Sequence, residues 1–172
     1  MTEINKNPGA IVPGATSVPV PKFNFAIRGL IGGTAAIALL GLAGQGLHGT
    51  VLIAPFGASC VLLFAAPESP FAQPRNLVFG HLLTASVGLA MLWLAGNSIW
   101  SMGLAVGLVI ALMELTRTVH PPAGANPIVI MLSGKVSLLF LITPVLCGVL
   151  VLLALALVVN NLGGKRWPVR WS

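Results

Sequence analysis

His120-Pro121-Pro122-Ala123-Gly124-Ala125-Asn126-Pro127 interrupts a chain that is otherwise a succession of long apolar runs. The two adjacent prolines lack backbone N–H donors and fix φ, and the glycine relaxes the backbone, so the first half of this stretch is predicted to be extended or irregular. Asn126 followed by Pro127 is typical of a helix N-cap with proline at the first helical position. We therefore expect an irregular segment that leads into a short helix over residues 127–133.

A second short apolar segment, residues 51–66, contains Ala54-Pro55-Phe56-Gly57-Ala58-Ser59. A shift of the sequence by 67 positions brings Gly57-Ala58-Ser59 onto Gly124-Ala125-Asn126. By this correspondence Ser59 is predicted to be the N-cap of a short helix over residues 60–66, and residues 55–58 are predicted to form a kink.

Four further stretches are long and apolar enough to cross a bilayer as helices, namely 27–47, 76–96, 98–118 and 137–160. Each half of the chain therefore reads as a long span, a kink, a capped short helix and another long span. This order predicts two three-segment repeats, about 27–96 and 98–160, in one transmembrane domain over residues 22–167. Residues 1–21 are predicted to be a flexible N-terminal tail, and residues 168–172 a C-terminal tail.

The composition agrees with an all-α integral membrane protein. Hydrophobic residues make up 56% of the 172 residues and charged residues only 7%, whereas a soluble globular domain carries about 25% charged residues. The net charge of +6 comes from cations at the ends of apolar segments, so we expect them to set the topology and expect no nucleic-acid partner. A separate catalytic domain does not fit within this length.

Two topologies are open. If both short segments cross the membrane, there are six crossings, both termini are cytoplasmic and only Lys135 lies outside, because these cations are all inside: Lys22, Arg28, Arg75, Arg117, Lys165, Arg166 and Arg170. In the alternative, four full spans with two re-entrant half-helices, Arg75, Arg117 and Lys135 are all outside. Since cationic loops prefer the cytoplasm, the sequence favours six crossings.

Three crossings per repeat make the second repeat inverted relative to the first. The N-terminal ends of the two short helices are then predicted to meet near the midplane of the membrane. A helix N-terminus presents unpaired N–H groups and the positive end of the helix dipole, so two of them would form an anion site. The predicted binding and pathway residues are Gly57, Ala58, Ser59, His120, Pro121, Pro122, Gly124, Ala125 and Asn126.

The ionisable residues near these segments have two interpretations. Glu114, Arg117 and His120 are spaced three apart and would share one helical face if the fourth long span extended that far. They then form either an anion-attracting vestibule or an interfacial pair that anchors the helix end. His48 and His81 are lone imidazoles, which we interpret as packing or interfacial residues. Cys60 and Cys147 are isolated, and no metal or cofactor is expected.

The segment His120 to Pro127 resembles the signature for which the HPP family of integral membrane proteins is named, and the resemblance covers about residues 22–167. Cyanobacterial and chloroplast members of that family are linked to nitrite transport. The resemblance therefore implies a small monovalent inorganic anion, with nitrite as the lead. The helix-end dipoles point to an anion independently of that name.

We accordingly expect a membrane transporter or channel for such an anion, not an enzyme. A pore for small neutral molecules such as water, ammonia or nitrous acid is the second hypothesis, because the same dipoles would repel cations and let neutral molecules pass. A remote third is an intramembrane enzyme in which Ser59 or Glu114 pairs with His120. We also expect a homo-oligomer in a bacterial inner membrane, since the glycine-rich spans offer flat packing faces.

Overall fold

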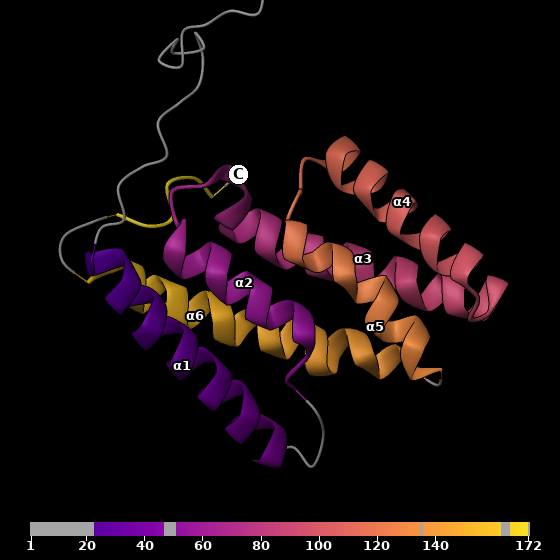
Figure 1. Ribbon diagram of the computed structural model, residues 1–172, viewed down its shortest axis with the longest axis horizontal. Helices are drawn as coiled ribbons and strands as arrows, with labels where there is room; N and C mark the ends of the chain where they lie inside the picture. The colour runs from indigo at the N-terminus through magenta and orange to yellow at the C-terminus, as the bar shows by residue number, and fades with distance from the viewer. Residues whose placement is uncertain (1–22, 47–50, 135, 163–165, 172) are drawn as a thin grey trace, which may run out of the picture.

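The computed structural model describes residues 23–46, 51–134, 136–162 and 166–171, and every regular element in these ranges is helical (Figure 1). The α-helices are α1 (Phe23–Gly46), α2 (Ala54–Ala65), α3 (Pro74–Ala95), α4 (Ile99–Thr116), α5 (Asn126–Ser133) and α6 (Cys147–Asn161). The shorter elements are the 3₁₀ helices η1 (Pro70–Ala72), η2 (Pro121–Ala125) and η3 (Leu138–Leu141), and one π-helical turn, η4 (Ile142–Leu146). The predicted N-terminal tail lies outside the described residues.

The outer surface of the bundle is apolar. Four segments are long and apolar enough to cross a membrane: Phe23–Gly46, Pro74–Ala95, Ile99–Thr116 and Leu138–Asn161. Large apolar side chains project from them into the surroundings, among them Leu94 (86% exposed) and Trp100 (85% exposed). Apolar groups in such numbers are stable outside only when lipid surrounds them. The fold is therefore an all-α integral membrane domain, as predicted.

The connections between helices show that α2 returns to the end from which α1 starts. Arg28 near the start of α1, Glu68 before α3 and Arg166 after α6 line one cavity of about 270 Å³. At the same end, Arg75 at the start of α3 donates a hydrogen bond from Nη2 to the carbonyl of Thr116, where α4 finishes (3.1 Å). This basic end thus collects the starts of α1 and α3 and the ends of α4 and α6, which is the arrangement that six crossings predict.

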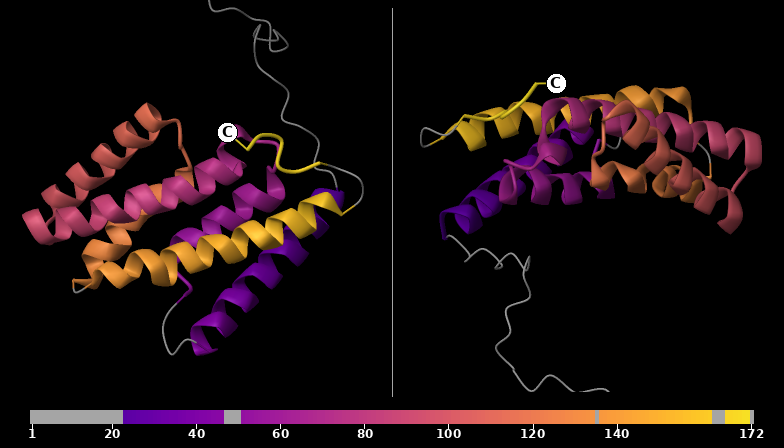
Figure 2. Two further views of the ribbon diagram at one scale, coloured as in Figure 1. Left: turned by 180° about the vertical axis from the view of Figure 1, so that it is seen from behind. Right: turned by 90° about the horizontal axis from the view of Figure 1, so that it is seen from above.

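The packing of the helices follows the predicted repeat. α3 packs against α4 and α5, and α6 packs against α1 and α2. The last helix of each half therefore packs against the first two helices of the opposite half. Figure 1 shows that α1 and α4, α2 and α5, and α3 and α6 run in opposite directions, and Figure 2 shows α6 between α1 and α3 from behind. An exchange of the two halves therefore preserves the neighbours of each helix, as an inverted repeat would.

The kink predicted at residues 55–58 is wrong. α2 begins at Ala54, and its N-cap position is Ile53, so Ser59 lies inside the helix and caps nothing. Pro55 is in the first turn, where its missing N–H has no intrahelical partner to lose and its fixed φ suits the helix. The proline therefore starts this helix rather than delaying it, and the non-helical stretch is confined to residues 51–53 among those described.

The segment after His120 is also more regular than predicted. Residues 121–125 form a 3₁₀ helix, whose first hydrogen bond runs from the Ala123 N–H to the His120 carbonyl (2.9 Å). The two prolines lie at the start of this helix, where no backbone N–H is needed for its hydrogen bonds. Asn126 is the first residue of α5 and its side chain makes no capping hydrogen bond. A different break occurs in the last span, where Thr143 has non-helical φ and ψ immediately before Pro144.

Close helix contacts form at glycines. A Cβ on Gly88 would lie 2.8 Å from the Cα of Pro127, and a Cβ on Gly80 would lie 2.8 Å from the Cβ of His120. On the other side of the bundle, Gly148 lies against the ring of Phe56. By contrast, these glycines of α1 and α4 have open space beside them: Gly33, Gly41, Gly46, Gly103 and Gly107.

We predict that Gly88→Ala destabilises the fold by about 1–3 kcal/mol, because the added methyl group meets the backbone of Pro127, which has no room to yield. Gly107→Ala is the matched control and is expected to be neutral or slightly stabilising, since nothing lies within 4 Å and alanine favours a helix. Unfolding in mixed micelles, followed by loss of helical circular dichroism, measures both. Equal stability of the two variants would contradict the close α3–α5 contact.

The topology is tested by labelling single cysteines from either side of sealed vesicles, in a background with Cys60 and Cys147 replaced by alanine. Arg117→Cys and Arg170→Cys are expected to react from one side and Asn97→Cys, in the α3–α4 turn, from the other. Four spans with two re-entrant half-helices would instead place Asn97 with Arg170, opposite Arg117. That pattern would overturn the six-crossing arrangement.

Candidate functional site

Five polar side chains meet inside the bundle with little or no solvent contact: Ser59, His81, Thr84, His120 and Asn126, each 0% exposed. We call them the His–Ser cluster. They come from the middle of α2, from α3, from the residue before η2 and from the first residue of α5. His81 lies seven residues into α3, roughly 10 Å along its axis. Polar groups this deep in a membrane domain are costly and mark function or tightly satisfied structure.

The hydroxyl of Ser59 links the two imidazoles. Its Oγ lies 2.9 Å from Nε2 of His81 and 2.9 Å from Nε2 of His120, and 3.2 Å from the carbonyl oxygen of Pro55 one turn earlier. The two rings are also neighbours, with centroids 5.1 Å apart. One serine thus stands between two groups that can each accept or donate a hydrogen.

The partners of the rings determine which nitrogen carries hydrogen. Nδ1 of His120 lies 2.8 Å from the carbonyl oxygen of Phe71, which can only accept, so this nitrogen donates. Nε2 of a neutral His120 then accepts from the Ser59 hydroxyl, and the Ser59 oxygen accepts from Nε2–H of His81. Nδ1 of His81 is left as an acceptor, and it faces Nδ2 of Asn126 at 3.1 Å. The hydrogen bonds therefore run in one direction from Asn126 to Phe71.

Asn126 is held in its orientation by α3. The two hydrogens on its Nδ2 are shared among Nδ1 of His81, the carbonyl of His81 (3.1 Å) and Oγ1 of Thr84 (2.9 Å). The Thr84 hydroxyl in turn donates to the carbonyl of Gly80 (2.8 Å). The amide oxygen Oδ1 is buried and has no hydrogen-bond partner. An unpaired buried acceptor costs about 1–3 kcal/mol, so this atom is available for a donor that reaches the cluster.

The local sequence explains why the cluster forms. Gly80 has no side chain, so the backbone at Thr118 to His120 can approach α3 closely. Asn76, one turn before Gly80, donates from Nδ2 to the carbonyl of Val119 (2.7 Å) and holds that segment in place. Phe56 covers His81 from α2 with its ring edge, at a centroid distance of 5.2 Å.

The structure brings together three of the predicted site residues, Ser59, His120 and Asn126. Gly57 and Gly124 have open space beside them. The remaining predicted residues line an apolar groove of about 590 Å³ between α2 and η2, namely Ala58, Pro121, Pro122 and Ala125. Ala54 and Pro55, which were not predicted to be site residues, also line it. The start of α2 therefore lies beside an apolar groove and does not face the start of α5 across a polar gap, because α2 begins earlier than predicted.

Sequence reasoning missed two members of the cluster, His81 and Thr84. His81 was interpreted as a packing residue because it stands alone in an apolar span, and nothing in the linear sequence connects it with Ser59. The available signal is local: Gly80, His81 and Thr84 lie within two turns of one helix, where a small residue marks close approach of another backbone.

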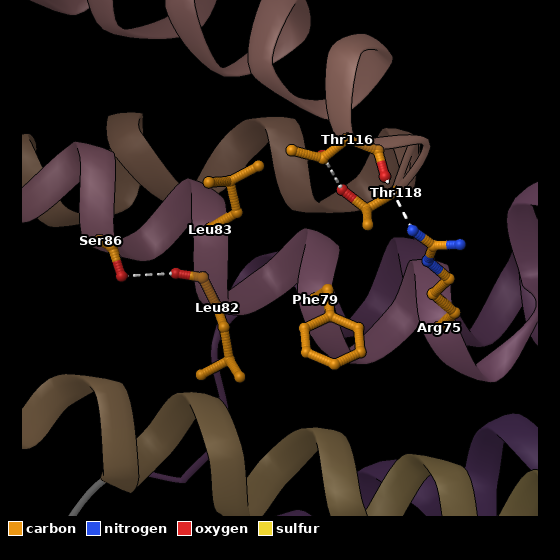
Figure 3. Close-up of a pocket in the computed structure, with 7 residues that line it drawn as sticks. All are labelled: Arg75, Phe79, Leu82, Leu83, Ser86, Thr116 and Thr118. Carbon is orange, nitrogen blue, oxygen red and sulfur yellow. Dashed lines mark hydrogen bonds between the residues drawn. The ribbon is translucent and has the colours of Figure 1, made fainter. Parts of the chain in front are cut away.

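The predicted vestibule is not formed as expected. α4 ends at Thr116, and Arg117 adopts a left-handed conformation (φ 56°), so Glu114, Arg117 and His120 do not share a helical face. Glu114 and Arg117 are exposed, whereas His120 is completely buried. The cation beside the α4 end is Arg75, which lines a pocket of about 410 Å³ with Thr116, Thr118 and apolar residues of α3 (Figure 3).

The cluster contains two imidazoles that could bind a metal, but no group of three or more His, Cys, Asp or Glu residues occurs in the part of the chain that the structure describes. His48 lies outside the described residues.

Apolar helices around a buried polar cluster define a multi-pass integral membrane protein. The chain belongs to the HPP family, since the family model described as "HPP, transmembrane region" matches residues 18–168. It is 42% identical over 129 residues to one transmembrane protein of Dictyostelium discoideum and 41% identical over 128 residues to another. These matches cover 70% of this chain but only 45% and 41% of the relatives, so the chain spans less than half of their length. No solved structure matches.

We predict that Asn126→Leu destabilises the protein by about 1–3 kcal/mol, because Nδ1 of His81 and Oγ1 of Thr84 each lose a buried donor. Ser133→Ala is the control on the same short helix. Its hydroxyl is exposed and donates only to the Val129 carbonyl one turn earlier, so the change is expected to stay within about 0.5 kcal/mol. Detergent unfolding followed by tryptophan fluorescence compares the two, and a neutral Asn126→Leu would contradict a satisfied network at this position.

Proposed function

We propose that this protein moves a small solute across the membrane through the His–Ser cluster. The observation that carries the proposal is the complete burial of five polar side chains inside an apolar bundle, with Oδ1 of Asn126 left unpaired. Ionisable and polar residues inside a membrane domain mark substrate pathways and proton relays, because a purely structural core avoids their desolvation cost. Broken or short helices in matching halves, here α2 and α5, occur at transport sites.

A small monovalent inorganic anion, with nitrite as the lead, is the proposed solute. Five arginines lie on segments that meet at the basic end: Arg28, Arg75, Arg117, Arg166 and Arg170. Positive charge at one mouth raises the local concentration of anions. Membership of the HPP family supports the same direction, because the family resemblance implies nitrite.

A pore for small neutral molecules is the second candidate, and one observation favours it. The hydrogen-bond partners of the His–Ser cluster are its own members and backbone carbonyls, and the directional order deduced above uses neutral imidazoles throughout. An uncharged site does not compensate the charge of a bare anion in a low-dielectric interior. Ammonia, water or nitrous acid would bind there without that penalty.

An intramembrane enzyme has the least support. Ser59 and His120 are within hydrogen-bond distance and the Phe71 carbonyl orients the imidazole, which resembles a nucleophile, a base and an orienting group. However, Ser59 has no exposed surface, and its oxygen is also occupied by His81. A substrate carbonyl would have to displace the cluster before it could react.

The proposed setting is a homo-oligomer in a bacterial inner membrane with both termini cytoplasmic. Gly33 and Gly41 on α1 and Gly103 and Gly107 on α4 have nothing within 4 Å of a Cβ position, so these faces are free to pack against a second copy. The relatives identified come from a eukaryote, so they do not support a bacterial membrane. The proposed orientation, with both termini cytoplasmic, is supported by the distribution of cations along the chain itself.

The test is protein-dependent uptake of nitrite into liposomes, with protein-free liposomes as the blank because nitrous acid crosses lipid unaided. We expect uptake by the unchanged protein, a loss of roughly tenfold or more with Asn126→Leu, corresponding to about 1.4 kcal/mol at the barrier, and no change with Ser133→Ala. Each rate is referred to the amount of folded protein recovered. Uptake that survives Asn126→Leu would remove the cluster from the pathway.

The two solute classes differ in their response to voltage. A bare anion carries current, so its flux changes when a potassium gradient and ionophore set the membrane potential. A neutral molecule moves at a rate that is independent of voltage. Nitrite uptake that is independent of voltage would exclude passage of the bare anion alone and leave electroneutral passage, either as nitrous acid or as the anion together with a proton.

A further inference from the structure

The Ser59 hydroxyl can pass a proton between the two imidazoles without any movement of the helices. Both Nε2 atoms lie 2.9 Å from the same oxygen, a distance at which hydrogen-bonded groups exchange protons. If His81 carries an extra proton, its Nε2–H bond breaks and a new bond forms to Oγ of Ser59. The original Ser59 O–H bond breaks as that hydrogen bonds to Nε2 of His120. Ser59 ends unchanged, His81 is neutral with hydrogen on Nδ1, and His120 is an imidazolium.

Asn126 supplies what the protonated state needs. A hydrogen on Nδ1 of His81 requires an acceptor, and the atom now facing it, Nδ2 of Asn126, is a donor. A half-turn of the amide would bring the unpaired Oδ1 into this position, where it accepts from His81, and would move Nδ2 to the place that Oδ1 leaves. The orphaned oxygen is thus unsatisfied in the neutral cluster and satisfied when a proton is bound.

In the part of the chain that the structure describes, the hydrogen-bond partners of the two imidazoles are uncharged groups. The groups facing the imidazoles are Phe56 and Ser59 from α2, Thr84 from α3 and Asn126 from α5. The titratable groups on the packed helices are the Cys60 thiol on α2, Cys147 on α6, Arg75 near the start of α3, Arg28 on α1 and Glu114 on α4. Arg75 is engaged with the Thr116 carbonyl and Glu114 is exposed, so neither contacts the imidazoles.

We propose that the His–Ser cluster takes up one proton together with each monovalent anion, so that the pair crosses as an electroneutral unit. The imidazolium charge is shared by His81 and His120 through Ser59, and it offsets the anion charge in the low-dielectric interior. This inference rests on the proposed function. It explains how a cluster that is neutral at rest could bind an anion. The cluster becomes cationic only when the proton and the anion are bound together.

The first measurement is proton movement with nitrite in liposomes that contain a pH indicator. Nitrite entry is expected to acidify the interior by about one proton per nitrite. Ser59→Ala interrupts the relay and is expected to lower both fluxes by roughly tenfold or more, while Ser133→Ala leaves both unchanged. Absence of any protein-dependent nitrite flux would refute the proposed function itself. Nitrite flux without accompanying acidification would refute only the coupling.

The second measurement locates the proton, which separates coupling from passage of nitrous acid through a neutral pore. In protein labelled with ¹⁵N-histidine, addition of nitrite at constant pH is expected to convert one imidazole signal of the cluster to imidazolium. Asn126→Asp places a carboxylate against Nδ1 of His81 and is expected to give that imidazolium signal without nitrite. Nitrite binding that leaves both imidazoles neutral would overturn the proposal. This measurement uses the unchanged protein, so it does not depend on whether the Ser59→Ala variant folds.

Discussion

The hydrogen bonds of one buried hydroxyl constrain most of this fold. Ser59 holds two imidazoles at 2.9 Å each, and those imidazoles are in turn tied to a carbonyl at the basic end and to an amide at the start of α5. Inside a membrane no water replaces a lost partner, so each of these groups must find its partner within the protein. Four segments far apart in the sequence are therefore kept at hydrogen-bond distance from one another. Glycines at positions 80 and 88 permit the backbone approach that this requires.

The same network explains why the site is not a preformed anion cage. Apart from Oδ1 of Asn126, its donors and acceptors already satisfy one another in the resting state, and the groove beside α2 is lined mostly by apolar groups. A solute can bind only by replacing hydrogen bonds of the cluster or by bringing an extra hydrogen to the unpaired oxygen of Asn126. Recognition by such a site depends on the protonation state of the imidazoles more than on helix dipoles. In the proposed function, the basic end would act at a longer range, by concentrating anions at the mouth.

Much of the architecture could be predicted from residue patterns, and much of the site could not. The long spans, the two short helices and their order follow from apolar length and from proline and glycine positions. The predicted start of the first short helix was wrong, because a proline can either occupy the first turn of a helix or break its interior. The local sequence around Pro55 does not distinguish these two roles. Ser59, His120 and Asn126 were selected for roles as caps or pore residues, yet they meet as partners of His81. The sequence does not show which residues contact that imidazole, because Ser59, His120 and Asn126 lie 22, 39 and 45 residues away from it.

Residue patterns alone indicate that this chain is a membrane protein, that its two halves have the same order of segments, and that the cations favour six crossings. These properties depend on composition and on spacing along the chain, which burial in lipid converts directly into helices and topology. The packing of the helices is needed to see which polar residues share a site and that Ser59 lies between two imidazoles. Hydrogen bonds are short and directional, so their partners depend on how helices rotate and pack, and that information is not contained in the pattern of any single segment.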